Sequence, residues 1–72
     1  MKILTQDRIR IFNFSGNVWA ADISGQGYIV TEKVSGSPYV GTYKDIDRAT
    51  EVLREIFQYY RAGEKSYIMP EE

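Results

Sequence analysis

The 72-residue sequence predicts an α+β fold, an antiparallel meander sheet of four to five short strands with one C-terminal amphipathic helix packed on one face. Short runs of β-branched and aromatic residues alternate with turn residues over positions 1–44, a pattern typical of strands. Turns of three or four residues join neighbours that run antiparallel. Only positions 45–62 repeat apolar residues at helical spacing over a long segment. We expect residues 1–72 to form a single domain.

Ile3 and Leu4 open a short apolar run, and after an interruption at Thr5–Asp7 a second run spans residues 8–14. In this run Ile9 and Ile11 alternate with two arginines, which is the period of a half-buried strand. We therefore expect Ile9 and Ile11 to face the core, and Arg8 and Arg10 to project from the opposite face. Unless a bulge shifts the phase, the same alternation places two aromatic rings on the arginine side, namely Phe12 and Phe14.

Three further strands are predicted by runs rich in β-branched and aromatic residues, and they span 18–23, 28–34 and 39–43. Turn sequences with Gly, Ser, Asn or Pro precede them, at Ser15–Asn17, Ser24–Gly27 and Ser35–Pro38. In the first of these strands alternate residues share one face, namely Trp19, Ala21 and Ile23. After the helix, residues 66–69 either form an edge strand or lie against the body of the domain, until Pro70 ends pairing.

The predicted helix carries its own start and stop signals. Asp45 can cap the first turn, and Asp47 adds negative charge at the positive end of the helix dipole. Gly63 can take the left-handed conformation that closes a helix. The apolar stripe that we expect to be buried against the sheet contains Ile46, Ala49, Val52, Leu53, Ile56, Phe57 and Tyr60. The polar side, with carboxylates such as Glu51 and Glu55 one turn apart, is interpreted as a solvated surface.

The composition excludes many kinds of chemistry. The chain contains neither Cys nor His, which excludes disulfides, zinc–thiolate sites and catalytic triads built on these residues. We therefore expect a protein that is not an enzyme and that uses no metal or cofactor. A net charge of −1 argues against long nucleic acids as partners. No window is long enough to span a bilayer and the N-terminus is too polar for a signal peptide, so we expect a cytoplasmic protein that binds no membrane.

Aromatic residues make up 14% of the chain, more than one helix on one sheet face can cover. Tyr39 and Tyr43 are expected to share a strand face on either side of Gly41, with Tyr28 on the neighbouring strand. A small residue flanked by rings leaves a slot in which a flat ligand can stack. The alternative is that Gly41 accommodates the helix, while the tyrosines cover core edges or a dimer contact. Tyr59 lies off the helical stripe and indicates a subunit contact.

Two other features favour an anionic ligand. Arg8 and Arg10 lie near aromatic residues, an arrangement that suits a phosphate together with a base, although arginines also keep an outer strand soluble. The glycine-rich turns offer backbone N–H groups to an anion, although ordinary hairpin turns have the same composition. The candidate ligand-binding residues are Arg8, Arg10, Phe12, Trp19, Gly25, Gly27, Tyr28, Tyr39 and Tyr43, and the candidate interface residues are Phe14, Tyr59 and Tyr67.

Three stretches of the chain form a familiar combination. They are Met1–Asp7, the Gly41–Lys44 strand end followed by Ala49-x-x-Val52-Leu53-x-x-Ile56, and Tyr67–Glu72. Together they resemble a group of short uncharacterised proteins from Gram-positive bacteria, their phages and mobile elements. The resemblance implies a small sheet-plus-helix domain and carries no activity or catalytic residue. Because small phage proteins are often aimed at host machinery, it also favours a binding function.

The sequence leads to two functional hypotheses. The first is a non-catalytic binding protein that forms a homo-oligomer and sequesters a small anionic, nucleotide-like ligand, as a phage protein does in anti-defence. The second is a protein-interaction module that inhibits or regulates a host protein through the outer sheet face or an exposed strand edge. A chain of 72 residues buries only about 60% of its surface on folding, which favours oligomerisation.

Overall fold

The computed structural model describes residues 1–14, 17–32, 34 and 36–72. Within these residues the chain forms six strands and one helix, which confirms the predicted α+β class. The elements are β1 (Lys2–Leu4), β2 (Ile11–Asn13), β3 (Val18–Ile23), β4 (Gln26–Thr31), β5 (Tyr39–Tyr43), α1 (Ile46–Arg61) and β6 (Ser66–Ile68). Parts of the predicted turns Ser15–Asn17 and Ser35–Pro38 lie outside the described residues, as does Lys33 of the predicted strand 28–34.

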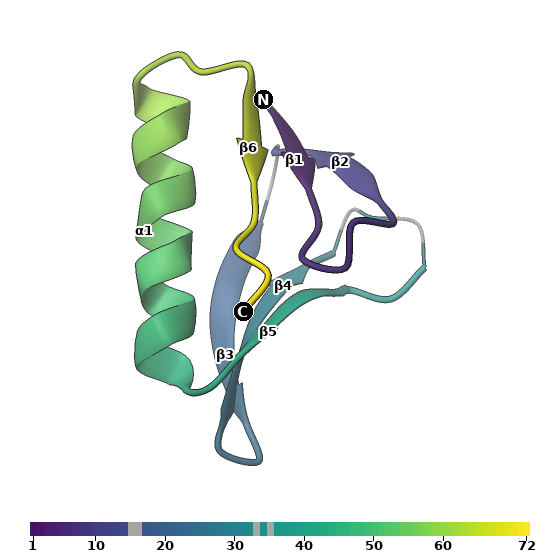
Figure 1. The fold of residues 1–72 in the computed structure, drawn as a ribbon, viewed down its shortest axis with the longest axis vertical. Coiled ribbons are helices and arrows are strands. Elements are labelled where there is room, and N and C mark those ends of the chain that lie inside the picture. The colour runs from purple at the N-terminus through teal and green to yellow at the C-terminus, as the bar shows by residue number, and fades with distance from the viewer. Residues whose placement is uncertain (15–16, 33, 35) are drawn as a thin grey trace.

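The strands form two three-stranded sheets (Figure 1). The meander sheet is antiparallel, has the order β3-β4-β5, and carries α1 on one face, as predicted. The terminal sheet has the order β2-β1-β6, in which β1 is antiparallel to β2 and parallel to β6. Sequence reasoning placed all strands in one sheet. The structure differs because α1 carries the chain back along the domain, so that β6 runs beside β1 in the same direction.

The predicted strand 8–14 is shortened at its start by the loop that joins β1 to β2. The Thr5 hydroxyl donates to Asp7 Oδ1 at 2.6 Å, and this bond together with a backbone N–H lowers the pKa of the Asp7 carboxyl. Arg8 has a φ of 67°, a left-handed conformation that a strand does not contain. The prediction that Arg8 and Arg10 project from one strand face is therefore wrong.

This loop also sets the phase of β2. Phe12 pairs with Ile3 across the hairpin, and both side chains are buried in the core. The expectation that Ile9 and Ile11 face the core is wrong, since these side chains are 79% and 66% exposed. The alternation is real at β2, but the residue that follows the isoleucine is the one that points inward.

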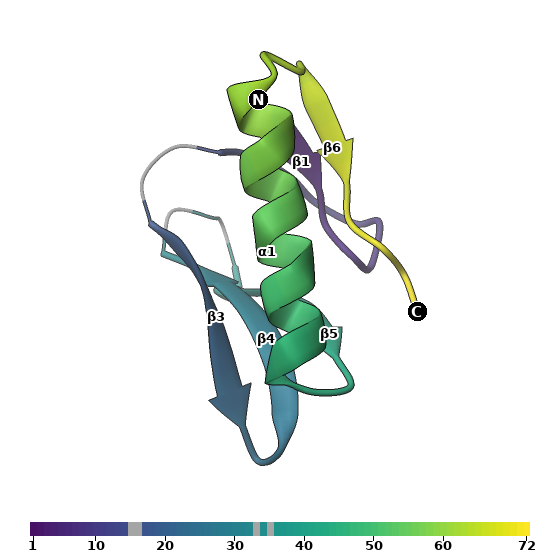
Figure 2. The same ribbon diagram turned by 90° about the vertical axis from the view of Figure 1, so that its left-hand side faces the viewer.

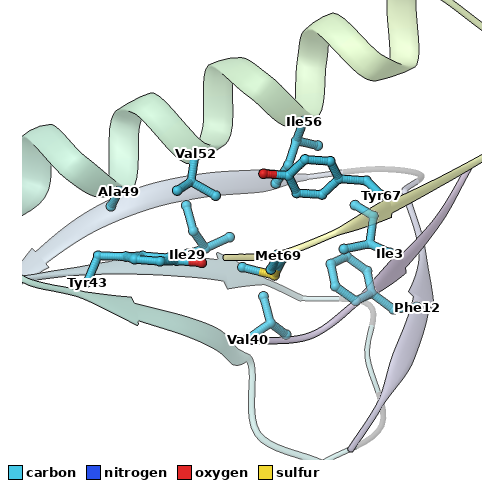
Figure 3. Packing of buried hydrophobic residues seen from close by; sticks show 10 residues of the cluster. All are labelled: Ile3, Phe12, Ile29, Val40, Tyr43, Ala49, Val52, Ile56, Tyr67 and Met69. Atoms are coloured by element: carbon cyan, nitrogen blue, oxygen red, sulfur yellow. The ribbon is translucent and has the colours of Figure 1, made fainter. Parts of the chain in front are cut away.

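The core lies between the helix and both sheets (Figure 3). The terminal sheet contributes Ile3, Phe12 and Tyr67, the meander sheet Ile29, Val40 and Tyr43, the helix Ala49, Val52 and Ile56, and the segment after β6 Met69. Burying a large apolar side chain stabilises a fold by about 1.5–3 kcal/mol. Because every layer supplies part of one cluster, neither sheet is covered without the helix and the other sheet.

Helix α1 begins and ends as predicted. Asp45 Oδ1 accepts from the Arg48 backbone N–H at 2.9 Å, and Gly63, just beyond the helix, has a φ of 78°. Figure 2 shows α1 lying along β3 and β4. Part of the predicted stripe remains uncovered, because Phe57 and Tyr60 are 53% and 52% exposed. In the described part of the chain the meander sheet ends at β3, so no further strand lies beneath these two rings.

Gly27 lets the helix start close to the meander sheet. A Cβ atom at this position would collide with the Asp45 carbonyl group and with the Ala49 side chain. Gly27 also pairs with Asp22 on β3 and with Tyr43 on β5. The beginning of α1 is therefore held over the centre of the sheet, at the level of these three paired residues.

Candidate functional site

The outer face of the meander sheet, which is turned away from α1, gathers apolar side chains from all three strands. On β3, Val18 packs against the core, so Trp19 lies on the opposite face. Trp19 pairs with Val30 of β4, and Val30 pairs with Tyr39 of β5. Tyr28 precedes Val30 by two residues and lies on the same face. We call Trp19, Tyr28, Val30 and Tyr39 the aromatic platform.

A β-bulge places Tyr39 on this platform. The register between β4 and β5 shifts after Ile29, so that Ile29 pairs with Gly41 whereas Val30 pairs with Tyr39. As a result Tyr39 is 46% exposed and Tyr43 only 2%. The prediction that Tyr39 and Tyr43 share a strand face is wrong, because the extra residue reverses the alternation between them.

The rings of the platform are accessible, and two of them are held in place by contact with each other. Tyr28 and Tyr39 meet edge to face, with ring centroids 5.2 Å apart and planes at 63°. Such a pair contributes about 0.5–1.5 kcal/mol beyond its burial. Trp19, at the other end of the row, is 42% exposed, while Val30 between the rings is buried. The platform is thus an apolar floor with an exposed ring on each side.

Arg10 lies at the Tyr39 end of the platform. Its Nη2 donates to the Tyr39 carbonyl oxygen at 3.1 Å, and its Nη1 donates to the Ser37 carbonyl oxygen at 2.6 Å. Both acceptors are carbonyl oxygens, and together they orient the guanidinium group. That charge also contributes to the lowered pKa of Asp7. An anion that approaches this end of the platform meets an oriented cation.

Arg8 points to the C-terminal segment instead. Its Nη1 donates to the Met69 carbonyl oxygen at 2.6 Å, and its Nη2 lies 3.3 Å from a carboxylate oxygen of Glu71. The side chain therefore ties the β1–β2 loop to the residues that follow β6. The structure does not bring Arg8 and Arg10 together into one phosphate site.

The slot predicted beside Gly41 is filled by the protein itself. A Cβ atom at Gly41 would collide with the end of the Met69 side chain, so this glycine accommodates Met69 and not the helix. The Tyr43 hydroxyl donates to the Pro70 carbonyl oxygen at 3.0 Å, and burial raises the pKa of Tyr43 to about 12. Two predicted ligand-binding residues, Phe12 and Tyr43, are consequently core residues.

The predicted glycine-rich turn after β3 lies away from the platform's charged end, at the opposite end of β4 from the residues that pair with Tyr39. Gly25 has a φ of 84°, and its N–H donates to Asp22 Oδ1 at 3.2 Å. A carboxylate therefore already uses this N–H and repels a second anion. Gly27 is covered by the start of α1. The structure brings neither glycine to the platform.

The predicted interface residues occupy different environments. Tyr67 is buried, and its hydroxyl donates to Glu55 Oε1 at 2.7 Å; burial, together with this bond, raises the pKa of Tyr67. Tyr59 is partly exposed and meets the Tyr67 ring edge to face at 4.9 Å. Phe14 is half-buried and meets the Tyr60 ring at 5.1 Å. Tyr59 and Phe14 remain accessible, whereas Tyr67 belongs to the core.

Sequence reasoning missed a groove between α1 and the edge of the meander sheet. The groove has a volume of about 440 Å³ and is lined by Phe14, Val18, Leu53, Arg54, Phe57, Gln58 and Arg61. It was missed because the helical stripe was assumed to be buried across its whole width. The signal that could have found it is that width, since the stripe spans more of the helix than a three-stranded sheet can cover.

A second apolar surface lies on the outer face of the terminal sheet. Leu4 pairs with Ile11 on one side and with Ile68 on the other, which makes one row across β2, β1 and β6. Ile11 and Ile68 are both exposed. The row could not be found from the sequence, because it depends on the parallel pairing of strands that are more than 60 residues apart.

Neither the described residues nor the comparisons with known proteins add an assignment to this geometry. Among the described residues, no three acidic side chains are grouped closely enough to hold a metal ion. Nor does this part of the chain contain a helix long and apolar enough to cross a bilayer. The chain matches no protein-family model, no curated protein and no solved structure.

Proposed function

We propose that the protein is a non-catalytic binding protein that sequesters a small anionic, nucleotide-like ligand on the aromatic platform. The observation that supports this proposal is the presence of three aromatic rings on one open sheet face with the Arg10 guanidinium at its end. Four of the residues singled out in the sequence lie together here, namely Arg10, Trp19, Tyr28 and Tyr39.

The chemistry of this face suits binding without turnover. A base that stacks on an aromatic side chain gains about 1–3 kcal/mol, and the stack accepts any flat ring. A phosphate at the Tyr39 end gains a charge-assisted hydrogen bond from a guanidinium that two carbonyl groups already orient. Prior orientation lowers the entropy lost on binding. The platform itself carries only tyrosine hydroxyls as reactive groups, and that of Tyr28 donates to Gln26 Oε1 at 3.2 Å.

Sequestration is the action that such a site supports. In the cytoplasm, a small protein that binds a signalling nucleotide lowers the free concentration of that nucleotide by mass action. The resemblance to small proteins of Gram-positive bacteria and their phages supports a phage-encoded, anti-defence setting. In that setting the ligand is a nucleotide signal made by the host.

Trp19 provides a direct test, because it is the only tryptophan in the chain. Mono-, di- and cyclic nucleotides are titrated while Trp19 fluorescence and the thermal midpoint Tm are recorded. A nucleotide that stacks on the platform quenches the fluorescence. At a hundredfold excess over Kd it also raises the free energy of unfolding by about 2.7 kcal/mol, which raises Tm. If no nucleotide changes either signal, the proposal is wrong.

Matched variants locate the site by calorimetry. Arg10→Gln removes the charge at the platform, and Lys44→Gln removes an equal charge from the exposed residue after β5. Tyr39→Ala removes one ring. We expect Arg10→Gln and Tyr39→Ala to weaken binding at least tenfold, with Lys44→Gln unchanged. Equal losses from both charge variants would show a general electrostatic effect with no site on the platform.

A second candidate function, a protein-interaction module that regulates a host protein, is favoured by the row of Leu4, Ile11 and Ile68. Exposed aliphatic side chains in register across a sheet form a flat apolar contact surface. Pull-down from host extract, with Ile68→Asp as the variant, tests this function. A stoichiometric partner that Ile68→Asp releases supports it, and nucleotide binding with no recovered partner contradicts it.

A further inference from the structure

We propose that two copies of this chain associate through the β3 edge, with their meander sheets joined antiparallel and their α1 helices side by side. The inference does not rest on the proposed ligand. It starts from the backbone of β3, which lies at the edge of its sheet with no described strand on its outer side. An edge strand presents unpaired N–H and C=O groups to any strand that can approach.

β3 lacks the devices that normally blunt an edge. Its sequence from Val18 to Ile23 contains no Pro and no Lys, and its single charge is Asp22. The register with β4 is regular over all six residues, so no bulge interrupts the strand. The β3 edge is therefore suited to strand addition along its whole length.

The register of a two-fold pair can be derived from the faces of β3. Inner residues must oppose inner residues if both helices are to lie on the same side, which requires a pairing centred on a residue. Of these pairings, only those centred on Ala20 or on Ala21 pair all but one residue of β3. Centring on Ala21 places Trp19 of one copy opposite Ile23 of the other, and Ala20 opposite Asp22. An aromatic ring then faces an aliphatic side chain, and no two like charges meet. Centring on Ala20 loses this contact, so we assign the pairing centred on Ala21.

The same symmetry brings the helices to packing distance. Figure 2 shows α1 lying along β3 and β4. Neighbouring strands are about 4.8 Å apart, so a helix centred between β3 and β4 lies about 5 Å from the two-fold axis. The two helices are then about 10 Å apart, within the range at which helices pack. A second α1 would thus cover the side of the stripe that the single chain leaves open.

The level of the axis along α1 follows from contacts on both sides of Ala21. Asp22 pairs with Gly27, which lies directly beneath Asp45 and Ala49 of the helix start. Val18 lines the groove together with Leu53. Ala21 therefore lies at the level of the helix residues around Thr50. In the dimer the helices run antiparallel and cross near this residue.

The charges on the outward face of the helix, opposite the buried Ala49, Val52 and Ile56, also complement each other in that arrangement. Asp47 precedes Thr50 by three residues and Arg54 follows it by four, and residues seven apart lie on nearly the same side of a helix. Antiparallel helices that cross here place Asp47 of one copy level with Arg54 of the other, twice, and the long Arg54 side chain, which lines the groove, extends toward the second helix. Within the described residues neither Asp47 nor Arg54 has an ion pair in the single chain. The pairing thus gives both charges a partner.

Charge reversal tests the arrangement in ligand-free protein. Light scattering and sedimentation measure the dimer constant of the wild type, of Asp47→Arg, of Arg54→Asp and of the double variant. We expect each single reversal to weaken the dimer about tenfold or more, since two attractive pairs become repulsive, and the double variant to restore it. An equimolar mixture of the two single variants should form a heterodimer.

Two further measurements keep the test decisive if a reversal perturbs folding. Hydrogen exchange should show every β3 amide protected in the dimer, and only alternate amides in dilute protein. Ile68→Asp, on the terminal sheet, should leave the dimer unchanged. A chain that stays monomeric at all concentrations, or a dimer in which the reversals and the β3 amides show no effect, would overturn the inference. Because no nucleotide is present, failure here leaves the ligand titration as a separate question.

Discussion

The two edges of the meander sheet are covered to very different degrees. At β5, the Gln6 backbone N–H donates to the Val40 carbonyl oxygen at 3.2 Å. The Gln6 side-chain amide also bonds both backbone groups of Thr42, accepting from its N–H at 2.6 Å and donating to its carbonyl at 2.7 Å. At β3, no described residue covers the outer side of the strand in this way.

The difference shows how little is needed to close a sheet edge. A primary amide has the same donor and acceptor as a peptide group, so Gln6 takes the place of one residue of a neighbouring strand. Because it is a side chain, it satisfies the edge without extending the sheet. Within the meander sheet, β3 is therefore the edge that remains open to the strand addition proposed above.

Of the variants that alter one side of the meander sheet, Met69→Ala is expected to lower the free energy of unfolding the most. Met69 is fully buried against Gly41, so its truncation leaves a cavity beside β5 and should cost about 3 kcal/mol of unfolding free energy. Urea denaturation measures the loss. Ile68→Ala changes the exposed neighbour and should alter stability by less than about 0.5 kcal/mol. Equal losses for the two variants would show that Met69 does not support the β5 side.

A smaller effect is expected from opening the β5 edge at Gln6. Gln6→Ala removes the two bonds to Thr42 and one to the Glu71 carbonyl oxygen, which should cost about 2 kcal/mol. Gln6→Glu keeps the acceptor but loses both donated bonds, so its effect should be intermediate. Hydrogen exchange at the Thr42 amide provides the readout. Unchanged protection of this amide in Gln6→Ala would contradict the edge-closing role.

The smallest effect concerns the ionisation of Tyr43 on β5, which changes the free energy of unfolding only in alkali. Its pKa is raised from 10.0 to about 12, so the unfolded chain loses this proton first as the pH rises. The stabilisation is fully present below pH 10 and declines through about pH 12, by on the order of 2 kcal/mol. Denaturation across this range should show a shallower decline for Tyr43→Phe. The pKa of Tyr67 is also raised, so the free energy of unfolding of Tyr43→Phe should still decline to some extent with pH. An unchanged slope would exclude Tyr43 as its source.

The fold was predictable where its signals are local. The cap at Asp45, the stop at Gly63 and the 3.6-residue period identify α1 from neighbouring residues alone. The left-handed Arg8 and the bulge in β5 depend on bonds between distant segments, such as Arg8 with the Met69 carbonyl and Gln6 with Thr42. No local pattern encodes such contacts, so these details could not be predicted.

The candidate site was predicted in part for the same reason. Trp19 and Tyr28 follow from strand alternation, which needs only the sequence on either side. Tyr43 was misplaced because the bulge changes the phase within a five-residue strand. Phe12 was misplaced because the Thr5–Asp7 loop shortens the preceding strand. The width of the helical stripe indicated that some of it stays uncovered, but the place of the groove depends on the sheet ending at β3, which is a property of the assembled fold.

The parallel pairing of β1 with β6 has a consequence for how the chain folds. β1 and β6 close a loop of about 60 residues, and closing a long loop is slow relative to forming a hairpin. The β3–β4 hairpin and the helix that packs on it can form early, whereas Ile3 becomes buried only after β6 brings Tyr67 beside it. Pulse-labelling hydrogen exchange should find β4 amides protected before those of β1. β1, which precedes the other described strands in the chain, would then be among the last strands to acquire its native neighbours.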